Sequence, residues 1–349
     1  MTISLADRLI GLDHPPLVIA EMSGNHNQSL DRALAIVDAA AASGAHALKL
    51  QTYTADTITL NVRGGSFQVN DAESLWSGKN LHDLYKQAYT PWEWHEPIMQ
   101  RARDHDMLCF SSPFDESAVD FLEDLDVPAY KIASFENNHL PLIEKAAATR
   151  KPLIISTGMA SLGELEQAVT TARDAGCSDL ILLKCTSTYP ATPANTNIRT
   201  IPHLRKLFNC EVGLSDHTMG VGAAIAAVAL GASVIEKHFT LSRADGGVDS
   251  AFSLEPHELK SLVTESSQAW MSLGEVKYGP TEAEMRSLVF RRSIYVAENI
   301  KAGEAFTAHN LRIVRPGYGS PPSMYNLLIG KIAKKPFSKG EPLALESLI

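Results

Sequence analysis

Two histidines, His217 in GLSDHT and His238 in VIEKHF, each stand at the polar end of a short run of apolar residues. Imidazole is a common ligand of divalent transition metals, so a pair on adjacent strands suits an ion that keeps open positions for water and substrate. The alternative is a pair of hydrogen-bonded rim histidines. Spacing alone does not decide between them, because the chain offers no H-x-x-x-H or three-ligand pattern.

Lysines inside apolar runs indicate an anion site. Lys49 and Lys131 are costly to bury unless a phosphate, a carboxylate ligand or an internal partner such as Glu21 meets each ammonium group. Hydroxyl donors occur in comparable runs, at Ser134, Ser156 and Ser215. Because no G-x-S-x-G elbow surrounds them, we expect these serines to bind a ligand rather than to act as nucleophiles.

Carboxylates and an arginine complete the candidates. Residues two apart in a strand share a face, so Glu236 is expected to point with the histidine that follows it, and Lys237 to point outward and snorkel. Glu136 and Asp249 are acid candidates, with exposed loop carboxylates as the alternative. Arg315 in RPGYGSPP suits bidentate capture of a carboxylate or an acetamido oxygen, and a plain surface arginine is the alternative there.

Eight short apolar runs must position these side chains. They are LVIAEM, ALKLQ, LCFSS, AYKIAS, PLIIST, LILLKC, EVGLSD and VIEKHF. Helical periodicity separates most of them, as in SLDRALAIVDAAAASG, where Ser29 is suited to cap the helix and Gly44 to end it. Strands that are apolar on both faces and alternate with helices are typical of a parallel sheet that helices bury on both sides. Eight of them predict a (β/α)8 TIM barrel, with a doubly wound open sheet as the runner-up.

The carboxyl ends of these runs are polar. In such a barrel, the strand ends and the loops after them carry the catalytic groups. A single buried lysine or serine is usually structural. Polar groups at every strand end instead predict a charged pocket for an anionic substrate, together with a metal.

The rest of the chain suggests further divisions. Residues 54–89 make a long connection with GG and WSGKN turns, which we expect to form a lid or rim over the pocket. The strand and helix rhythm predicts a barrel domain at 1–271 and a linker at 272–290. Residues 291–349 carry strand-like pieces such as SIYVA between KAGE and KGE turns, which predict a small β-rich domain.

Composition excludes several partners. A net charge of −9 argues against nucleic acid and against an anionic membrane surface. The segment MTISLADRLIGLDHPP lacks the apolar stretch of a signal peptide or a membrane helix, so we expect a cytoplasmic protein. The four cysteines show no C-x-x-C spacing and are expected to be reduced structural thiols.

In chain order, the motifs IAEMSGNHN, LKLQTY, FSSPFD, YKIASFE, LIISTGM, LLKCTSTYP, GLSDHTMG and VIEKHFTL resemble the sialic acid synthase family, which joins phosphoenolpyruvate to an acetamido sugar. The resemblance covers nearly the whole chain, because the C-terminal region is similar to that family's antifreeze-like (SAF) domain. Within the family, KLQTYTADTITL, LHDLYKQAYTPWEWH, KIASFENN, LLKCTSTYP and DSAFSL are most similar to pseudaminic acid synthases.

The resemblance implies roles for individual residues. A divalent metal ion, Mn²⁺, Mg²⁺ or Co²⁺, has ligands that match His217 and His238. Groups that hold phosphoenolpyruvate match Lys49, Lys131, Ser134, Ser156 and Ser215, and Gln51 and Ser112 lie in the same motifs. Positions near the acceptor sugar and the reacting carbons match Glu21, Glu136, Tyr189, Glu236 and Asp249. Ser187 stands where neuraminate synthases have asparagine.

Arg315 matches an arginine that the antifreeze-like domain of one subunit sends into the barrel of its partner. The resemblance therefore implies a domain-swapped homodimer.

The implied reaction condenses phosphoenolpyruvate with 2,4-diacetamido-2,4,6-trideoxy-L-altrose and water, to give pseudaminic acid and phosphate by carbon–oxygen cleavage. The metal polarises the sugar aldehyde, and a carboxylate such as Glu136 or Glu21 assists the proton transfers. An N-acetylneuraminate or legionaminate synthase is the nearest alternative. More distant ones are an aldolase with a Schiff base on Lys131 or Lys184 and a non-enzymatic glycan- or ice-binding protein.

Overall fold

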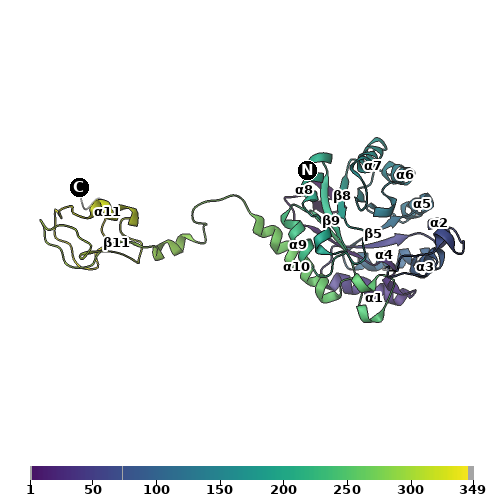
Figure 1. Cartoon of the computed structure of the whole chain (residues 1–349), viewed down its shortest axis with the longest axis horizontal. Coiled ribbons are helices and arrows are strands. Elements are labelled where there is room, and N and C mark those ends of the chain that lie inside the picture. The colour runs from purple at the N-terminus through teal and green to yellow at the C-terminus, as the bar shows by residue number, and fades with distance from the viewer. Residues whose placement is uncertain (1, 73, 345–349) are drawn as a thin grey trace. The chain divides into compact units, whose positions relative to one another are not determined.

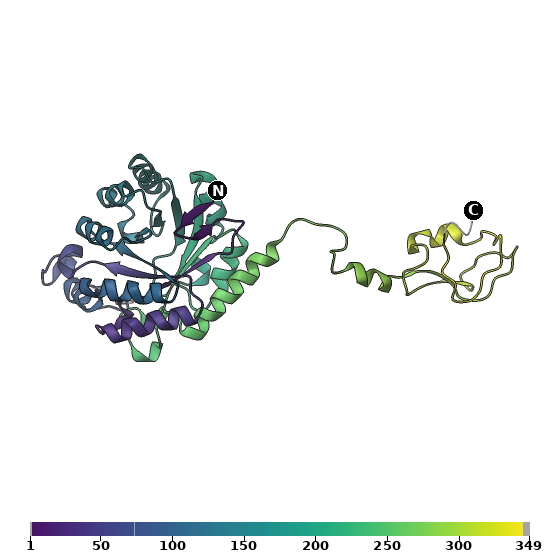
Figure 2. The same cartoon turned by 180° about the vertical axis from the view of Figure 1, so that it is seen from behind.

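The computed structural model describes residues 2–72 and 74–344, so the last five positions of the predicted 291–349 domain lie outside the described residues. The chain separates into two compact units, Met1–Gly274 and Glu275–Ile349. Figures 1 and 2 show them from opposite sides: a larger unit of strands surrounded by helices, and a smaller unit of short strands and turns.

Eight parallel strands close into a barrel in the first unit, which confirms the predicted fold. They are β3 (Leu17–Glu21), β4 (Ala47–Thr52), β5 (Leu108–Pro113), β6 (Tyr130–Ile132), β7 (Leu153–Ser156), β8 (Leu180–Cys185), β9 (Glu211–Asp216) and β10 (Val234–His238). Successive strands pair in order, and β10 then pairs with β3, from Val234 opposite Leu17 to His238 opposite Glu21. Because this pairing closes the sheet, the open doubly wound alternative is wrong.

Helices connect the strands and cover the outside of the barrel (Figure 1). The main ones are α1 (Leu30–Ala42), α4 (His95–Asp104), α5 (Glu116–Asp124), α6 (Leu140–Ala148), α7 (Leu162–Asp174), α8 (Thr200–Phe208), α9 (Gly222–Ala229) and α10 (Pro256–Leu273). As predicted, Ser29 caps α1, where its Oγ accepts the N–H of Arg32 at 3.2 Å. Gly44 follows the helix with a φ of 83°, which glycine adopts without strain. Within the described ranges, no helix has the length and apolar character needed to cross a membrane.

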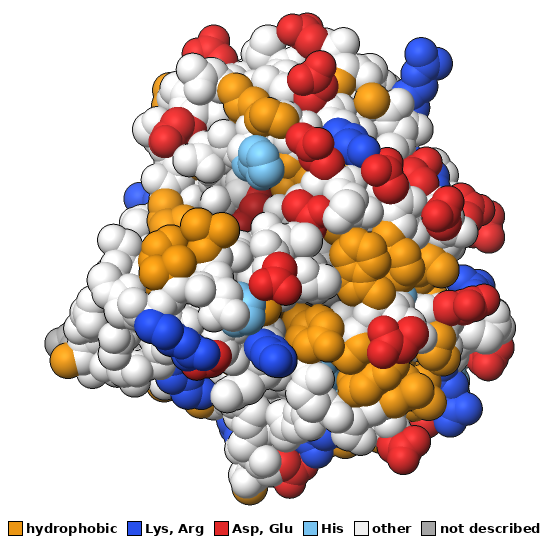
Figure 3. Space-filling view, turned by 90° about the vertical axis from the view of Figure 1, so that its right-hand side faces the viewer, with side chains coloured by type: hydrophobic (Ala, Val, Ile, Leu, Met, Phe, Trp, Pro, Cys, Tyr) orange, Lys and Arg blue, Asp and Glu red, His pale blue; other side chains and the backbone are white. Residues whose placement is uncertain are grey.

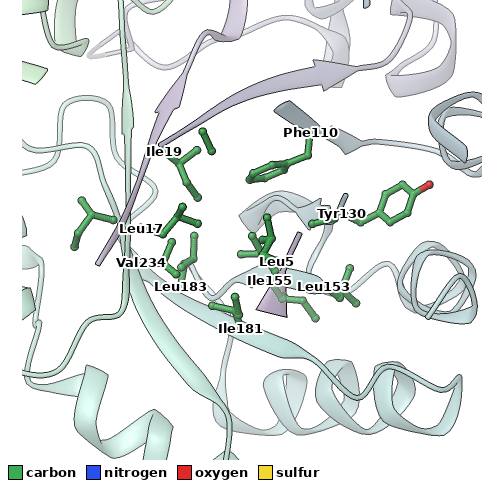
Figure 4. Close-up of a cluster of buried hydrophobic side chains, with 14 of the residues drawn as sticks. Leu5, Leu17, Ile19, Phe110, Tyr130, Leu153, Ile155, Ile181, Leu183 and Val234 are labelled. Atoms are coloured by element: carbon green, nitrogen blue, oxygen red, sulfur yellow. The ribbon is translucent and has the colours of Figure 1, made fainter. Parts of the chain in front are cut away.

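The amino-terminal end of the barrel is filled by an apolar cluster. Figure 4 shows Leu17, Ile155 and Ile181 in this cluster, and all three side chains are buried. A hairpin of β1 (Ile3–Leu5) and β2 (Arg8–Ile10) adds Leu5, which has no exposed surface. The sequence does not predict this hairpin, because strands of three residues are too short to show a periodic pattern.

The long connection between β4 and α4 is built from short elements. It contains α2 (Ala55–Ile58), α3 (Leu81–Ala88) and an isolated bridge between Gln68 and Asn80. His82 Nε2 lies 2.9 Å from Asp56 Oδ1, so the two helices are joined to each other. Apart from residue 73, which lies outside the described residues, the predicted segment 54–89 is therefore an ordered insertion.

The second unit has its own small core. An antiparallel pair of strands, β11 (Ser293–Val296) and β12 (Leu311–Val314), is followed by α11 (Tyr325–Leu328). Isolated bridges join Ile300 to Phe337 and Ala305 to Ile332. The core side chains are Ile294, Val296, Ile300, Phe306, Leu311, Leu328, Ala333, Phe337 and Leu343. This unit is the β-rich domain that the C-terminal sequence predicts.

Candidate active site

The carboxyl ends of the barrel strands surround a cavity of 580 Å³. Most of the predicted site residues line it: Glu21, Lys49, Gln51, Lys131, Ser134, Glu136, Ser156, Tyr189, Ser215, His217, Glu236, His238 and Asp249. A larger groove, of 1010 Å³, lies beside α8 and α9 and is lined by Lys184, but by none of that set among the residues described. The charged cavity is therefore the candidate active site.

Two lysines and two glutamates form the floor of this cavity. Lys49 Nζ lies 2.7 Å from Glu21 Oε2 and 3.8 Å from Glu236 Oε2. Lys131 Nζ lies 3.5 Å from Glu236 Oε1. None of the four side chains is more than 5% exposed, so the charges must compensate one another. Strand register contributes to this, because Glu21 stands directly opposite Lys49.

The two ammonium groups of the floor are not equivalent. Burial disfavours the charge of Lys49, but Glu21 and Glu236 outweigh that effect and raise its pKa. Burial lowers the pKa of Lys131, and Glu236 compensates only in part. Of the two lysines, Lys131 therefore gains more from a bound anion.

The two carboxylates of the floor also differ. Burial raises the pKa of Glu21, and Lys49 opposes the shift without cancelling it. Burial acts on Glu236 in the same direction, but Lys131 and Lys49 overcome it and lower the pKa to about 2. Glu236 is therefore the permanent negative charge between the two lysines.

Hydroxyl groups hold the floor in place. Ser215 Oγ donates to Glu236 Oε1 at 2.9 Å, and Lys49 Nζ donates to Ser112 Oγ at 3.3 Å. Ser112 is buried at the β4–β5 contact and is not among the side chains that line the cavity. Ser112 therefore positions the Lys49 ammonium group by accepting its hydrogen bond.

Beside the floor, the backbone at Gly158, after β7, lies very close to two serine side chains. The Gly158 N–H donates to Ser134 Oγ at 3.2 Å, and a Cβ at this position would clash with the hydroxyls of Ser134 and Ser187. Ser187, a predicted substrate-binding residue, is not among the side chains that line the cavity. Ser156 Oγ is buried and finds no hydrogen-bond partner in the described parts of the chain. A buried, unpaired hydroxyl is a donor available to a ligand oxygen.

The predicted histidine pair meets in the cavity. The ring centroids of His217 and His238 lie 5.3 Å apart. His217 donates its Nδ1 proton to the carbonyl of Thr186 at 2.9 Å, which leaves Nε2 to bind a ligand. His238 Nδ1 is buried with no hydrogen bond to any described residue, and it lies 3.8 Å from Asp249 Oδ2.

This arrangement fits a weakly held divalent ion. Over residues 2–72 and 74–344, no three His, Cys, Asp or Glu side chains are grouped as a metal site. Two imidazoles, one fixed in the required tautomer and one with an unpaired buried nitrogen, supply two ligands. Water and substrate oxygens would have to complete the coordination, and the cavity leaves room for both.

Lys237 does not snorkel, so that expectation is wrong. Its Nζ lies 2.9 Å from Asp216 Oδ2 and donates to the carbonyls of Thr218 and Gly220 at 2.6 and 2.7 Å. These oxygens solvate the ammonium group inside the protein, where the residue is 1% exposed. The loop that carries His217 is thereby fixed from outside the barrel.

Ser23 is a site residue that the sequence patterns do not indicate. Its Oγ donates to Asp249 Oδ2 in a short contact and accepts from Gln51 Nε2 at 3.2 Å. Gln51 also donates to Glu21 Oε1 at 2.9 Å. A hydrogen-bonded chain therefore connects the floor to the carboxylate beside His238. The available signal is the position of Ser23, two residues after Glu21 at the end of β3.

Glu136 is placed for proton transfer. It ends η4 (Ser134–Glu136), the turn that follows β6. Burial raises its pKa to about 7, although Lys131 and Lys49 oppose the shift. Its Oε2 is buried and has no hydrogen-bond partner among the residues described. A carboxyl group that titrates near neutrality can both give and take a proton.

Aromatic side chains form the outer part of the cavity. The Tyr189 ring centroid lies 4.5 Å from that of His217 and 5.8 Å from that of Trp76. Phe135, 58% exposed, lies 6.5 Å from Tyr189 between ring centroids. Figure 3 shows further hydrophobic side chains gathered on the face that carries α2. The sequence predicts only Tyr189 here, because loop aromatics follow no period.

The cysteines are free and buried, as expected. Cys185, at the end of β8, also lines the cavity, and its Sγ lies 3.9 Å from His217 Nδ1. The sequence indicates nothing of this contact, since a cysteine in an apolar run reads as a core residue.

Arg315 belongs to the second unit, where it is exposed and directly follows β12. The turn after it is well bonded. Ser293 Oγ donates to the carbonyl of Pro316 at 2.7 Å, and the N–H of Gly317 donates to the carbonyl of Val289 at 2.8 Å. The guanidinium is therefore presented from a structured turn.

Fold and site together define a class, a (β/α)8 barrel enzyme whose strand ends gather lysines, carboxylates and imidazoles around a charged cavity. More particularly, the chain belongs to the NeuB family, which matches residues 36–278, and the SAF domain matches residues 291–349. The resemblance to sialic acid synthases is thus confirmed.

Relatives extend over almost the full chain. A protein named pseudaminic acid synthase from Campylobacter jejuni is 44% identical, over 95% of this chain and 96% of the relative. A protein of the same species named N,N'-diacetyllegionaminic acid synthase is 36% identical, over 93% and 98%. The crystal structure of an N-acetylneuraminic acid synthetase from Leptospira borgpetersenii, 33% identical, matches with a TM-score of 0.73 over 82% of this chain and 95% of that one.

Proposed function

We propose that the protein is a metal-assisted pseudaminic acid synthase. It condenses phosphoenolpyruvate with 2,4-diacetamido-2,4,6-trideoxy-L-altrose and water, and releases phosphate. The observation that carries this proposal is the meeting of two buried lysines with two imidazoles in one cavity. The 44% identity to a protein of that name supports the same reaction.

Phosphoenolpyruvate suits the floor of the cavity. It carries a phosphate and a carboxylate, and the ion pair of Lys131 with Glu236 is long, at 3.5 Å, so it compensates the buried charge only in part. Ser156 and Ser134 add hydroxyl donors. Because these groups are fixed before the reaction, they stabilise developing negative charge without reorganisation.

His217 and His238 would hold a divalent ion, for which we propose Mn²⁺, Mg²⁺ or Co²⁺. When bound, such an ion acts as a Lewis acid toward the aldehyde oxygen of the open-chain sugar. Asp249 Oδ2 lies 3.8 Å from His238 Nδ1, beyond hydrogen-bond distance, and accepts the Ser23 hydroxyl.

Glu136 is the proposed proton-transfer residue. The enol carbon of phosphoenolpyruvate forms a bond to the aldehyde carbon, water adds to the carbon that bears the phosphate, and phosphate leaves as the carbon–oxygen bond breaks. With a pKa of about 7, Glu136 can accept the proton of that water and return it to a leaving or newly formed oxygen.

A synthase for legionaminic or N-acetylneuraminic acid is the second candidate. It is favoured by the 36% identity to the legionaminic acid synthase and by the similarity to the Leptospira structure. These enzymes would share the cavity floor and differ in the sugar.

The deciding experiment measures phosphate release from phosphoenolpyruvate with a panel of acetamido sugars. We expect the 2,4-diacetamido-6-deoxy-altrose to give the highest kcat/KM. A chelator should abolish turnover, and added divalent metal should restore it. Absence of phosphate release with every sugar, in metal-supplemented buffer, would reject the proposal.

Heavy-oxygen water tests the bond that breaks. Label is expected in the product, at the carbon derived from the enol, and not in the released phosphate. Label in phosphate would instead indicate phosphorus–oxygen cleavage and would remove the role proposed for Glu136.

We further propose a cytoplasmic homodimer in which each chain is divided into a barrel domain at 1–271, a linker at 272–290 and an SAF domain at 291–349. In this assembly Arg315 of one chain enters the barrel of the other. The exposed, well-bonded turn after β12 supports this role, because it presents an exposed guanidinium that could bind a carboxylate or an acetamido oxygen.

A further inference from the structure

We propose that the outer part of the cavity is an apolar wall that selects the methyl-bearing acceptor sugar, and that Trp76 is its specificity-determining residue. The outer wall consists of Ile58, Val69, Trp76, Tyr85, Tyr189 and Val248. This inference rests on the proposed function, because it assigns a place in the site to the 6-deoxy and acetamido groups.

The cavity has two chemically distinct zones. Its floor carries the lysines, glutamates and histidines already described. The insertion at 54–89, in contrast, contributes four of the outer-wall side chains, Ile58, Val69, Trp76 and Tyr85. Phosphoenolpyruvate is small and charged and belongs on the floor. The remaining apolar zone therefore faces the second substrate.

Trp76 fastens the insertion across the cavity. Its Nε1 donates to the carbonyl of Val248 at 3.1 Å, and both residues line the cavity. The Tyr189 ring completes the contact, with its centroid 5.8 Å from that of Trp76. The outer wall is thus continuous from the insertion to the loops after β8 and β10.

The loop that receives the Trp76 hydrogen bond is itself fixed. Arg32 Nη1 lies 2.8 Å from Asp245 Oδ2, and Asn27 Nδ2 donates to the carbonyl of Gly246 at 3.2 Å. The next residue after Val248 is Asp249, which is held by Ser23. Trp76 therefore attaches the insertion to a rigid anchor, and losing that attachment should loosen the wall and not the floor.

An apolar wall discriminates by contact with methyl groups. The proposed acceptor presents two acetamido methyls and a C6 methyl, whereas a sugar with a C6 hydroxyl would have to strip that group of water against the wall. Hydrophobic pockets separate such pairs by about 10- to 100-fold in kcat/KM. We therefore expect the wild-type protein to prefer the 6-deoxy sugar over its 6-hydroxy counterpart by a factor in that range.

The test uses Trp76→Ala, which removes the ring, and Trp76→Phe, which keeps a ring and removes the N–H donor. Trp270→Phe is the matched control, because Trp270 Nε1 makes the same kind of bond, to the carbonyl of Leu12 at 2.8 Å, from α10. For each protein, kcat/KM is measured with the 6-deoxy and the 6-hydroxy 2,4-diacetamido sugar. The Kd for phosphoenolpyruvate is measured by calorimetry.

We expect Trp76→Ala to reduce the 6-deoxy preference by about 10-fold and to change the Kd for phosphoenolpyruvate by less than about 2-fold, since the floor is a separate zone. Trp76→Phe should reduce the 6-deoxy preference by a smaller factor than Trp76→Ala, because it loosens the wall but keeps a ring. It should also raise KM for the sugar more than it lowers kcat, and should speed hydrogen exchange in residues 74–80. Trp270→Phe should change none of these quantities.

The inference is overturned if active Trp76 variants keep the wild-type preference, or if phosphoenolpyruvate binding weakens in step with sugar binding. A wild-type protein that releases phosphate with no acetamido sugar overturns the proposed function instead, so the two failures are distinguishable. Should Trp76→Ala fail to fold, the Trp76→Phe values alone decide between these outcomes.

Discussion

At the scale of single residues, the site separates charge that is fixed from charge that is available. Lys49 forms ion pairs with two carboxylates, Glu21 and Glu236. Lys131 shares Glu236 with it and has no contact as short as the 2.7 Å pair of Lys49 with Glu21. Glu136 stands apart, with a pKa near neutrality. These differences arise from burial and from neighbours, so each can be tested by one substitution.

Replacement of Lys131 by methionine keeps most of the side-chain volume and removes the charge. We expect the Kd for phosphoenolpyruvate to rise by about 10- to 100-fold, the usual loss for a charge-assisted hydrogen bond. Calorimetry measures this directly. Lys145→Met is the control, because Lys145 makes its 2.7 Å ion pair with Asp120 on the helical surface. Unchanged binding in Lys131→Met would remove this lysine from the anion site.

Glu136→Gln tests proton transfer through the pH dependence of turnover. If Glu136 acts as a base, the wild-type kcat rises with pH through a limb near 7, where the carboxyl ionises. In Glu136→Gln we expect the limb to vanish and kcat to fall by about 10²- to 10⁴-fold. Glu265→Gln, on the exposed side of α10, should leave both unchanged. A limb that persists in Glu136→Gln would assign it to another group.

The same shift predicts a change of stability with pH. Burial raises the Glu136 pKa from 4.5 to about 7, so the folded state favours the protonated carboxyl. The associated stability is fully present below pH 4.5 and is lost as pH rises through 7. Relative to Glu136→Gln, the wild-type free energy of unfolding should therefore fall by about 3 kcal/mol between pH 4 and 8. Urea titrations at several pH values measure this, and a flat difference would contradict the burial argument.

At the scale of elements, the amino-terminal hairpin and the insertion at 54–89 serve opposite ends of the barrel. The hairpin places Leu5 in the apolar cluster, whereas the insertion supplies the outer wall around the polar cavity. Stability and specificity are therefore carried by different segments, and mutations in them should separate the two properties.

Leu5→Ala should destabilise the barrel without altering the site. Truncating a fully buried leucine usually lowers the free energy of unfolding by about 2–5 kcal/mol. Leu9→Ala is the control from the same hairpin, because Leu9 is 48% exposed and its loss should stay within about 0.5 kcal/mol. Denaturant titration gives both values. Equal losses in the two variants would contradict the contribution of Leu5 to the apolar cluster.

The parts of the fold and site that could be predicted from the sequence are those that follow a repeating pattern of apolar residues. The eight strands are predictable because each is a continuous apolar run, and the polar tips follow from the carboxyl ends of those runs. Trp76 and Ser23 are not predictable in this way, since they lie on loops and meet their partners, Val248 and Asp249, only through the closed fold. The Lys237 contacts are missed for a similar reason, because two of them are backbone carbonyls of a loop.

At the scale of the whole molecule, the chain carries a complete set of floor and wall residues in one unit and Arg315 in the other. The proposed homodimer would bring the two together between chains. Such a site depends on the partner subunit, so activity should depend on protein concentration wherever the dimer dissociates.

Mixing two inactive variants tests whether Arg315 acts between chains. At a phosphoenolpyruvate concentration well below the raised Kd of Lys131→Met, Lys131→Met and Arg315→Ala each show little activity as homodimers under the proposal. When equal amounts are dissociated and reassociated at random, half of the dimers are mixed and each of these has one intact site, so about a quarter of wild-type activity should return. A mixture of Lys131→Met with Glu136→Gln is the control and should stay inactive. No recovery in the first mixture, despite active Arg315→Lys or wild-type homodimers after the same treatment, would place Arg315 outside the partner's site.

The contacts of Lys237 limit how this scaffold can be redesigned. The loop bearing His217 is secured by a lysine of the neighbouring strand, through Asp216 and two loop carbonyls. A foreign loop grafted here, to change the ion that we propose His217 to bind, would carry the histidine without the Lys237 contacts that fix its position. A loop taken from another protein should therefore be transferred together with its own β10 strand, so that the residue equivalent to Lys237 comes with the loop that follows β9.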